Sequence, residues 1–458
     1  MPTCDFCGST QAWFKCKYCG GSFCTAHINP QLHDCKAKPS VQEIERAGLP
    51  TPLTVEKAFK LPAVKGKAAK EELGEVVRLE AEFNQYLDEL VHNRLERTIN
   101  FGKDFSALNL VIYLRKLFGK TLFFDSLLSI TQQYSASDVE IKSEIGALAG
   151  KTGFNLALFG HPGTGKTFAA YDMICGNTRA GVPAHGIIGR NRYCGGFTPA
   201  KFIDVGQAYE GRKYVFIVTE FNDWFKYKGM VEPLKLAMEG KEIRKETMHG
   251  TVGPYKFTSF FSVNYNVSVK EAGYRTTVGD PNFNAIEDRM LCRLHRLTID
   301  RFKEIADAQQ RVKLGTAKFD IAELIRDHAT LMYAIQTQHP LIKDELPQKP
   351  ILLTEKDYDK MIEARQAILE HLKYEKDIPF SPRLEWRALQ LASAMSLMSY
   401  CKIPKDKDVL PIDPYALRLG IRFYVEEASI RSKEEFSPEH VLFDLGIFWA
   451  DENAFKQP

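Results

Sequence analysis

Long apolar runs are missing from this sequence: no stretch of about twenty uninterrupted apolar residues occurs, so no segment is suited to span a membrane. An excess of one charge is also missing, because 61 Lys and Arg residues face 58 Asp and Glu residues. A surface that binds nucleic acid would therefore be a local patch. Residues 1–10 contain neither the basic nor the apolar segment of a secretory signal. We therefore expect a cytoplasmic protein, associated with the nucleoid if its source is prokaryotic, without a membrane partner.

Cysteine is sparse along most of the chain, yet six of the ten cysteines lie within residues 4–35. Cysteines that cluster in this way and alternate with histidines indicate a metal site rather than a disulfide framework. The potential ligands are Cys4, Cys7, Cys16, Cys19, Cys24, His27, His33 and Cys35. Eight ligands of these types are enough for two closed, tetrahedral Zn²⁺ sites, which are structural rather than catalytic. Because large apolar side chains are few here, we expect the metal to supply most of the stability of this block.

The remaining composition divides the chain into four further parts. Residues 41–70, with three prolines and five lysines, are predicted to be a linker. Residues 71–135 are predicted to be helical, with one long amphipathic helix over residues 71–99 and a second over residues 106–119. The long helix could pack on the rest of the chain or pair with a second helix in a coiled coil.

Residues 136–305 alternate short apolar strands with helical segments, which is typical of a parallel α/β domain. The candidate strands are Asn155–Phe159, Val215–Thr219 and Phe257–Val263. Residues 306–458 are predicted to form a helical connector, a helical lid and a C-terminal tail. The predicted fold class is therefore α/β, with a parallel sheet flanked by helices.

A phosphate-binding loop follows the first candidate strand. Its eight residues are Gly160, His161, Pro162, Gly163, Thr164, Gly165, Lys166 and Thr167, which match the pattern G-x-x-x-x-G-K-T between a strand and a helix. The glycines allow backbone N–H groups to surround the phosphates, and the helix N-terminus adds positive charge. Lys166 is expected to bind the β- and γ-phosphates of ATP, and Thr167 to bind Mg²⁺.

The next two candidate strands end in polar residues that suit hydrolysis. Glu220 follows an apolar strand, where ATPases place a carboxylate that polarises the attacking water. Thr219 takes the preceding position, at which an aspartate is usual and helps to hold Mg²⁺; we expect slower hydrolysis for this reason. Asn264 follows the third strand and is predicted to position the water between two strands of the sheet.

The cysteine and histidine block resembles the AN-one-type zinc finger at all eight ligand positions. The resemblance implies interleaved sites, with Cys4, Cys7, Cys24 and His27 at one ion and Cys16, Cys19, His33 and Cys35 at the other. Such modules contact proteins in many cases and nucleic acids in others, and the sequence does not decide between the two.

Residues 138–432 resemble AAA+ ATPases, and more specifically the minichromosome-maintenance (MCM) helicases and their relatives with a pre-sensor β-hairpin. The resemblance rests on residues 219–223, 236–240, 247–256, 286–289 and 381–383 and on the two nucleotide motifs. It implies a helix-two insert at 195–200, an arginine finger at Arg289 (with Arg293 as the alternative) and a sensor arginine at Arg383. It further implies a hairpin whose basic residues Arg244, Lys245 and Lys256 meet DNA in the pore of a homo-hexamer.

The sequence also departs from these helicases in three ways. No oligonucleotide-binding domain precedes the ATPase core, and the lysine at the hairpin tip is replaced near Thr247. The third departure is Thr219. We therefore weigh a DNA helicase or translocase on single-stranded or forked DNA, acting in replication of a chromosome or mobile element, against two alternatives. One is an AAA+ protein remodeller or chaperone with the zinc finger as adaptor, and the other is a slow ATP-gated switch.

Overall fold

In a computed structural model, the chain forms two compact units, residues 1–63 and 64–458. The structure describes residues 3–5, 14–15, 21–23, 67–227, 229–247, 250–266, 283–295, 297–372, 378, 380–432 and 436–449. In the first unit, β1 (Phe14–Lys15) pairs antiparallel with β2 (Ser22–Phe23). The elements that follow belong to the second unit.

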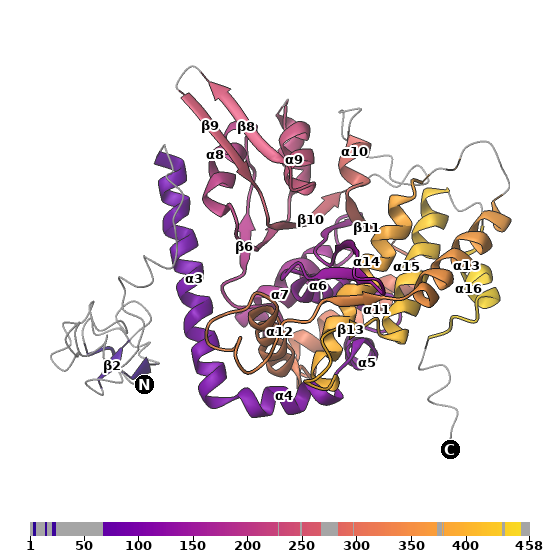
Figure 1. The fold of residues 1–458 in the computed structure, drawn as a ribbon, viewed down its shortest axis with the longest axis horizontal. Coiled ribbons are helices and arrows are strands. Elements are labelled where there is room, and N and C mark those ends of the chain that lie inside the picture. The colour runs from indigo at the N-terminus through magenta and orange to yellow at the C-terminus, as the bar shows by residue number, and fades with distance from the viewer. Residues whose placement is uncertain are drawn as a thin grey trace. The chain divides into compact units, whose positions relative to one another are not determined.

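A five-stranded parallel sheet forms the centre of the second unit (Figure 1), in the order β11-β5-β10-β7-β6. Its strands are β5 (Asn155–Gly160), β6 (Asn191–Cys194), β7 (Val215–Val218), β10 (Phe260–Asn266) and β11 (Met290–His295). Neighbouring strands are parallel throughout. The predicted strands are all present, and β10 lies between β5 and β7 although it follows both in the chain. The sequence-based prediction of an α/β fold with a parallel sheet is therefore confirmed.

Helices surround this sheet. They are α3 (Lys67–Asn93), α4 (Leu95–Asp104), α5 (Ala107–Phe118), α6 (Phe123–Ser135), α7 (Met173–Cys175), α8 (Pro199–Gly206), α9 (Val231–Met238), α10 (Phe283–Glu287), α11 (Ile299–Lys313), α12 (Ala322–Gln336), α13 (Glu355–His371), α14 (Arg383–Ser396), α15 (Pro414–Arg431) and α16 (Pro438–Asp444). Shorter helical segments are η1 (Phe168–Asp172), η2 (Thr178–Ala180), η3 (Gln207–Tyr209), η4 (Phe221–Lys226) and η5 (Leu397–Lys402). Among the described residues, no helix combines the length and the apolar character that crossing a bilayer requires.

A second, four-stranded sheet was not predicted from the sequence. Its order is β13-β12-β3-β4, from β3 (Glu140–Ser143), β4 (Leu148–Lys151), β12 (Ile351–Leu353) and β13 (Leu410–Pro411). These strands are two to four residues long, too short for alternation of side chains to reveal them. The sheet joins the segment before β5 to the C-terminal helices.

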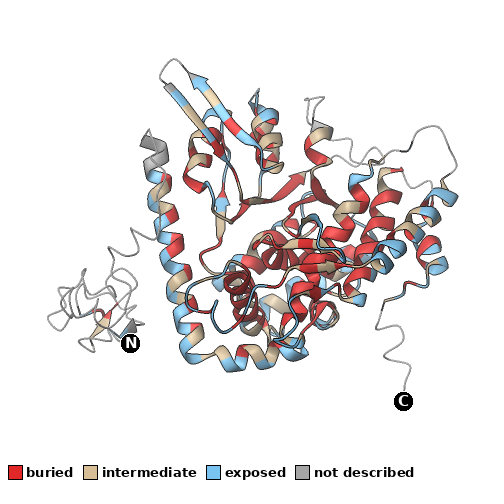
Figure 2. Ribbon diagram, viewed as in Figure 1, coloured by how far each residue is buried: buried red, intermediate tan, exposed pale blue. Residues whose placement is uncertain are grey.

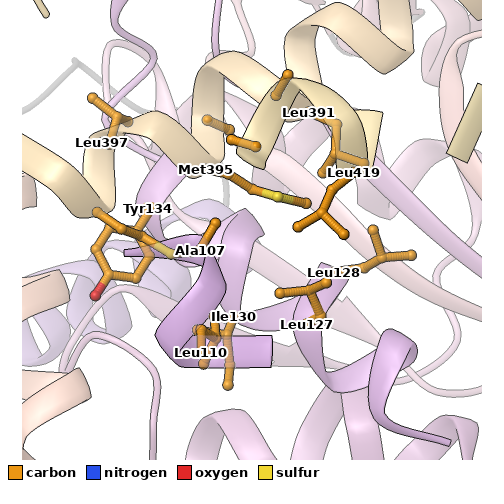
Figure 3. Close-up of a cluster of buried hydrophobic side chains, with 14 of the residues drawn as sticks. Ala107, Leu110, Leu127, Leu128, Ile130, Tyr134, Leu391, Met395, Leu397 and Leu419 are labelled. Atoms are coloured by element: carbon orange, nitrogen blue, oxygen red, sulfur yellow. The ribbon is translucent and has the colours of Figure 1, made fainter. Parts of the chain in front are cut away.

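A hydrophobic core lies between α5 and α6, which precede the central sheet in the chain, and α14 and α15, which follow it (Figure 3). Leu110, Leu128, Leu391, Met395 and Leu419 come from these four helices and are at most 3% exposed. β5 and β7 are buried along their whole length, as their apolar sequences require. Figure 2 shows that β10, which lies between them, is buried over most of its length. Since burial of such side chains is the main favourable term in folding, the helices at both ends of this unit support one shared core.

The long helix α3 packs on its own chain. Its apolar residues Val76, Leu79, Phe83, Leu87 and Leu90 are at most 3% exposed and belong to the two cores of the second unit. Two ion pairs add to this contact: Glu80 with Arg190 at 2.6 Å, which is buried, and Glu72 with Arg192 at 2.9 Å, which is partly buried. The apolar stripe that a coiled coil would require is therefore already used, and the packing interpretation is correct.

Candidate nucleotide site

The predicted phosphate-binding loop, residues 160–167, is called the P-loop below. It follows the carboxyl end of β5, the second strand in the order of the sheet. Gly163 and Gly165 have φ angles of +81° and +88°, a region that only glycine adopts without strain. A Cβ on Gly163 would meet no atom within 4 Å, so the loop keeps open space on that side. The helical residues that follow, from Lys166 into η1 and α7, begin at the loop as predicted. The sequence and the backbone conformation of this loop are therefore compatible with phosphate binding.

Lys166 is 5% exposed and lies folded over the loop. Its Nζ donates to the carbonyl oxygen of Gly160 at 2.9 Å and to that of His161 at 2.6 Å. Burial, together with the nearby Arg301 cation, lowers the pKa of Lys166 to about 8, and Asp125 and Glu220 oppose this change. The ammonium thus lies at the loop, with the Glu220 carboxylate close enough to act on it electrostatically.

Asn264 lies between the P-loop strand and β7, because β10 is inserted between them. Its Nδ2 donates to Thr167 Oγ1 at 3.2 Å, and the side chain is buried at 3% exposure. Its Oδ1 is buried and has no hydrogen-bond partner among the described residues. An unpaired buried acceptor beside Thr167 fits a bound water or hydrated cation at this point. Asn264 sits within β10 rather than after it, because pairing with β5 extends the strand to Asn266.

The end of β7 brings Thr219 and Glu220 to the same edge of the sheet. Thr219 Oγ1 lies 3.1 Å from the hydroxyl of Tyr193, a residue of β6 that the sequence did not single out. Glu220 is exposed to solvent. Just beyond it, Asn222 exchanges two hydrogen bonds with the backbone of Asn266, at 2.9 and 3.1 Å. These bonds tie the ends of β7 and β10 together and fix the turn that carries Glu220.

Arg289 and Arg383 lie together, far from the P-loop of their own chain. Arg289 precedes β11, whose first residue is in register with Asn155 and whose last is in register with Gly160. Six strand residues separate Arg289 from the level of the P-loop, or roughly 20 Å. Arg383 Nη1 lies 2.8 Å from Asp288 Oδ2, which places it at the same edge.

The two arginines differ in how they are held. Arg289 forms an ion pair with Glu239, and its side chain is 12% exposed. Arg383 is about half exposed, at 51%. Arg387 lies near both, and burial together with these two cations lowers its pKa, with Asp288 opposing. The alternative finger, Arg293, is instead paired with Glu426 inside the chain and lies over the ring of Phe124.

The predicted hairpin consists of β8 (Glu242–Thr247) and β9 (Gly250–Lys256), and it forms a sheet of its own (Figure 1). Its basic residues are accompanied by acids. Arg244 pairs with Glu246 at 2.7 Å, and Lys256 stands opposite Glu242 in the ladder. Lys245 is only partly exposed. The hairpin therefore presents mixed charge rather than a basic strip.

Cys4 is the one proposed zinc ligand in the described part of the chain, and it is 2% exposed. Cys7, Cys16, Cys19, Cys24, His27, His33 and Cys35 lie outside the described residues. Next to Cys4, Asp5 accepts a hydrogen bond from the backbone N–H of Ser22 at 2.7 Å and donates its own N–H to the carbonyl of Ser22 at 2.9 Å. The segment with Cys4 thus lies beside β2, whose last residue directly precedes Cys24 in the sequence.

Comparisons with known proteins add no assignment: no family model matches the chain, and no curated protein matches it significantly.

Proposed function

We propose that this chain is an ATP-hydrolysing AAA+ motor of MCM-like type, which translocates on or unwinds DNA. One observation carries the nucleotide part of the proposal. Lys166, Thr167, Asn264 and Glu220 come from three neighbouring strands and meet at one edge of the sheet. Ligands of parallel α/β sheets bind at this edge, beyond the carboxyl ends of the strands.

In the proposed reaction, the loop N–H groups and Lys166 would bind the β- and γ-phosphates of ATP, and Thr167 and Thr219 would hold the Mg²⁺. A cation held there would offset negative charge on the phosphates. Glu220 orients the attacking water and withdraws its proton, while Asn264 holds that water through its unpaired Oδ1. A hydroxyl pair, Thr219 with Tyr193, replaces the usual carboxylate, so we expect weak Mg²⁺ binding and slow turnover.

A second copy of the chain is needed to complete this site. Arg289 and Arg383 lie near the amino ends of the strands, whereas the P-loop follows the carboxyl end of β5. They therefore cannot reach the P-loop of their own chain. A neighbouring subunit would bring this edge to the P-loop, and each arginine would stabilise charge on the γ-phosphate in the transition state. Closed rings supply such head-to-tail contacts to every subunit. We therefore propose a homo-hexamer. In it, Arg289 would leave its ion pair with Glu239 and contact the γ-phosphate of the ATP bound by the neighbouring subunit.

Two variants test the nucleotide site. Lys166→Ala should abolish ATP binding and turnover. Glu220→Gln should bind ATP as tightly as wild type while turnover falls at least about a hundredfold, because only the base is lost. Binding is measured with a fluorescent ATP analogue and turnover by phosphate release. Wild-type protein that does not bind ATP, or Glu220→Gln protein with normal turnover, would refute the assignment.

Mixing two inactive variants tests the shared site. Lys166→Ala retains both arginines, and Arg289→Ala retains the P-loop. If the finger acts across subunits, equimolar mixing should restore activity, because some interfaces then combine an intact loop with an intact arginine. Absence of recovery, with mixed oligomers demonstrated by pull-down of a tagged subunit, would contradict the role of Arg289.

DNA dependence decides between the DNA motor and a protein remodeller. Single-stranded or forked DNA should stimulate the ATPase at low salt, and stimulation should fall as salt rises, because backbone contacts are salt-sensitive. The ion pair between Arg244 and Glu246 is the observation that favours a protein substrate. If DNA changes neither ATPase rate nor oligomerisation, the DNA motor is refuted. A turnover well above about one per minute would then reject the slow switch and leave the protein remodeller.

For the first unit we propose two structural Zn²⁺ ions in an AN-one-type finger that recruits a protein partner. The donor set of six thiolates and two imidazoles suits Zn²⁺. The bonds between Asp5 and Ser22 support a shared ion for Cys4 and Cys24, because they hold the residue next to Cys4 on β2, which directly precedes Cys24 in the sequence. Metal content of the purified chain, expected to be two Zn²⁺ per molecule, tests this assignment.

A further inference from the structure

A buried arginine lies behind the P-loop. Arg301, in the first turn of α11, has a side chain that is 6% exposed. Its Nη2 donates to the carbonyl oxygen of Thr164 at 2.9 Å and also pairs with the fully buried Asp125 of α6. Its Nη1 donates to the carbonyl of Thr121 at 3.3 Å. One guanidinium therefore connects the loop to the start of α6 and to α11.

Glu304, one turn further along α11, holds the same region. Its carboxylate accepts the backbone N–H groups of Lys120, Thr121 and Leu122 at 2.7, 2.8 and 3.0 Å. Leu122 in turn lies against the loop, since a Cβ on Gly165 would be 3.0 Å from its Cδ1. The segment before α6 is thus fixed by α11 and supports the loop from behind.

The contact with Thr164 bears on the orientation of the phosphate-binding groups. The carbonyl of Thr164 and the N–H of Gly165 belong to one peptide plane, and in a trans peptide they point in opposite directions. A donor that holds this carbonyl on the inner side therefore turns the Gly165 N–H toward the open side of the loop. Thr164 and Asp125 are both fully buried, so water does not compete for these bonds.

We propose that Arg301, with Asp125 as its counter-ion, is a positioning residue that keeps the P-loop in its phosphate-binding conformation. This inference rests on the proposed ATP site. Because the Gly165 N–H would contact phosphates in substrate and product alike, Arg301 acts on binding rather than on the chemical step. Asp125 offsets the free-energy cost of burying the Arg301 cation, since a buried cation without a partner is strongly destabilising.

The test compares Arg301→Gln with Arg311→Gln. Arg311 is the matched control, because it also lies on α11 and also donates to backbone carbonyls of the preceding segment, those of Lys116 and Leu117, at 3.1 and 2.7 Å. Its hydrogen bonds within the described part of the chain do not include the loop. For Arg301→Gln we expect the Kd for ATP and ADP and the KM to rise about tenfold, as for loss of a charged hydrogen bond, with kcat changed less than about twofold. Arg311→Gln should leave Kd and KM unchanged. Arg301→Lys, which keeps the charge and one donor, should recover most of the affinity.

Wild-type affinity in a folded Arg301→Gln protein would overturn the inference. If that variant does not fold, the double variant Asp125→Asn/Arg301→Gln decides. It buries no unpaired charge, and glutamine is shorter than arginine, so the bond to the Thr164 carbonyl is lost. Weakened ATP binding by the double variant supports the positioning role, and wild-type binding refutes it. Failure of the wild-type protein itself to bind ATP would instead refute the proposed function.

Discussion

Replacing Glu287 by Gln should stabilise the protein, by an amount that grows as pH rises from about 4.5 to about 7 and is then constant. Glu287 is the last residue of α10, two positions before Arg289, and is 7% exposed. Burial raises the pKa of its carboxyl to about 7 from an ordinary value of 4.5; Glu427 and Asp288 add to this rise, and Arg431 opposes it.

The sign follows from which state binds the proton. Below pH 4.5 the carboxyl is neutral in both the folded and the unfolded chain, so Glu287 costs nothing. As pH rises to about 7, the unfolded chain ionises freely while the folded chain retains its proton, and stability is lost across this window. The difference between pKa values of 4.5 and about 7 corresponds to about 3 kcal/mol once both states are ionised.

Urea denaturation of wild type and Glu287→Gln at pH 5 and pH 8 measures this cost. Gln is neutral at every pH and retains the shape of the protonated glutamate. The variant should differ from wild type by less than about 1 kcal/mol at pH 5 and be more stable by about 3 kcal/mol at pH 8. All other titrating groups are common to both proteins and cancel in the comparison. A difference in unfolding free energy that is the same at both pH values would refute the reasoning.

Three further predictions concern other parts of the molecule. Glu80→Gln removes the counter-ion of Arg190, held at 2.6 and 2.9 Å, and should lower the unfolding free energy by about 3–5 kcal/mol; a loss below about 1 kcal/mol in urea denaturation would contradict a buried ionic contact. Thr219→Asp supplies the missing carboxylate, so the Mg²⁺ concentration that half-saturates the ATPase should fall and turnover should rise. Equal Mg²⁺ dependence in variant and wild type would show that the hydroxyl pair does not contact the cation. Dialysis against a strong chelator should remove two Zn²⁺, measured by native mass spectrometry, and leave the melting transition of residues 64–458 unchanged.

The central strands and the P-loop could be predicted because their signals are local. Asn155–Phe159 was predicted as a strand, and β5 runs from Asn155 to Gly160, since an apolar run before a glycine-rich loop is read within a few residues. The predicted end of β10, Val263, is too early, since the strand runs to Asn266. That end depends on pairing with β5 and on Asn222, which are 44 or more residues away in the chain.

Contacts between distant parts of the sequence could not be predicted. Arg301 and Thr164 are 137 residues apart, and Tyr193 and Thr219 are 26 apart. Nothing in the sequence distinguishes Arg301 from the arginines that precede it, Arg289, Arg293 and Arg296. Similarly, Arg293 looked like an alternative finger in the sequence, and only the fold places Glu426 against it.

The length of β11 separates the two halves of the proposed site. Arg289 lies before the strand, and Arg301, which holds the P-loop, comes six residues after its end. Between them, every residue of β11 is paired with β5, so this part of the sheet cannot fold over to bring Arg289 to its own nucleotide. In the proposed site, a single subunit would therefore contain every group but could not bring Arg289 to the nucleotide bound by its own P-loop. Turnover per subunit should therefore rise with protein concentration until oligomers are complete, and turnover that is independent of concentration in a demonstrated monomer would contradict the shared site.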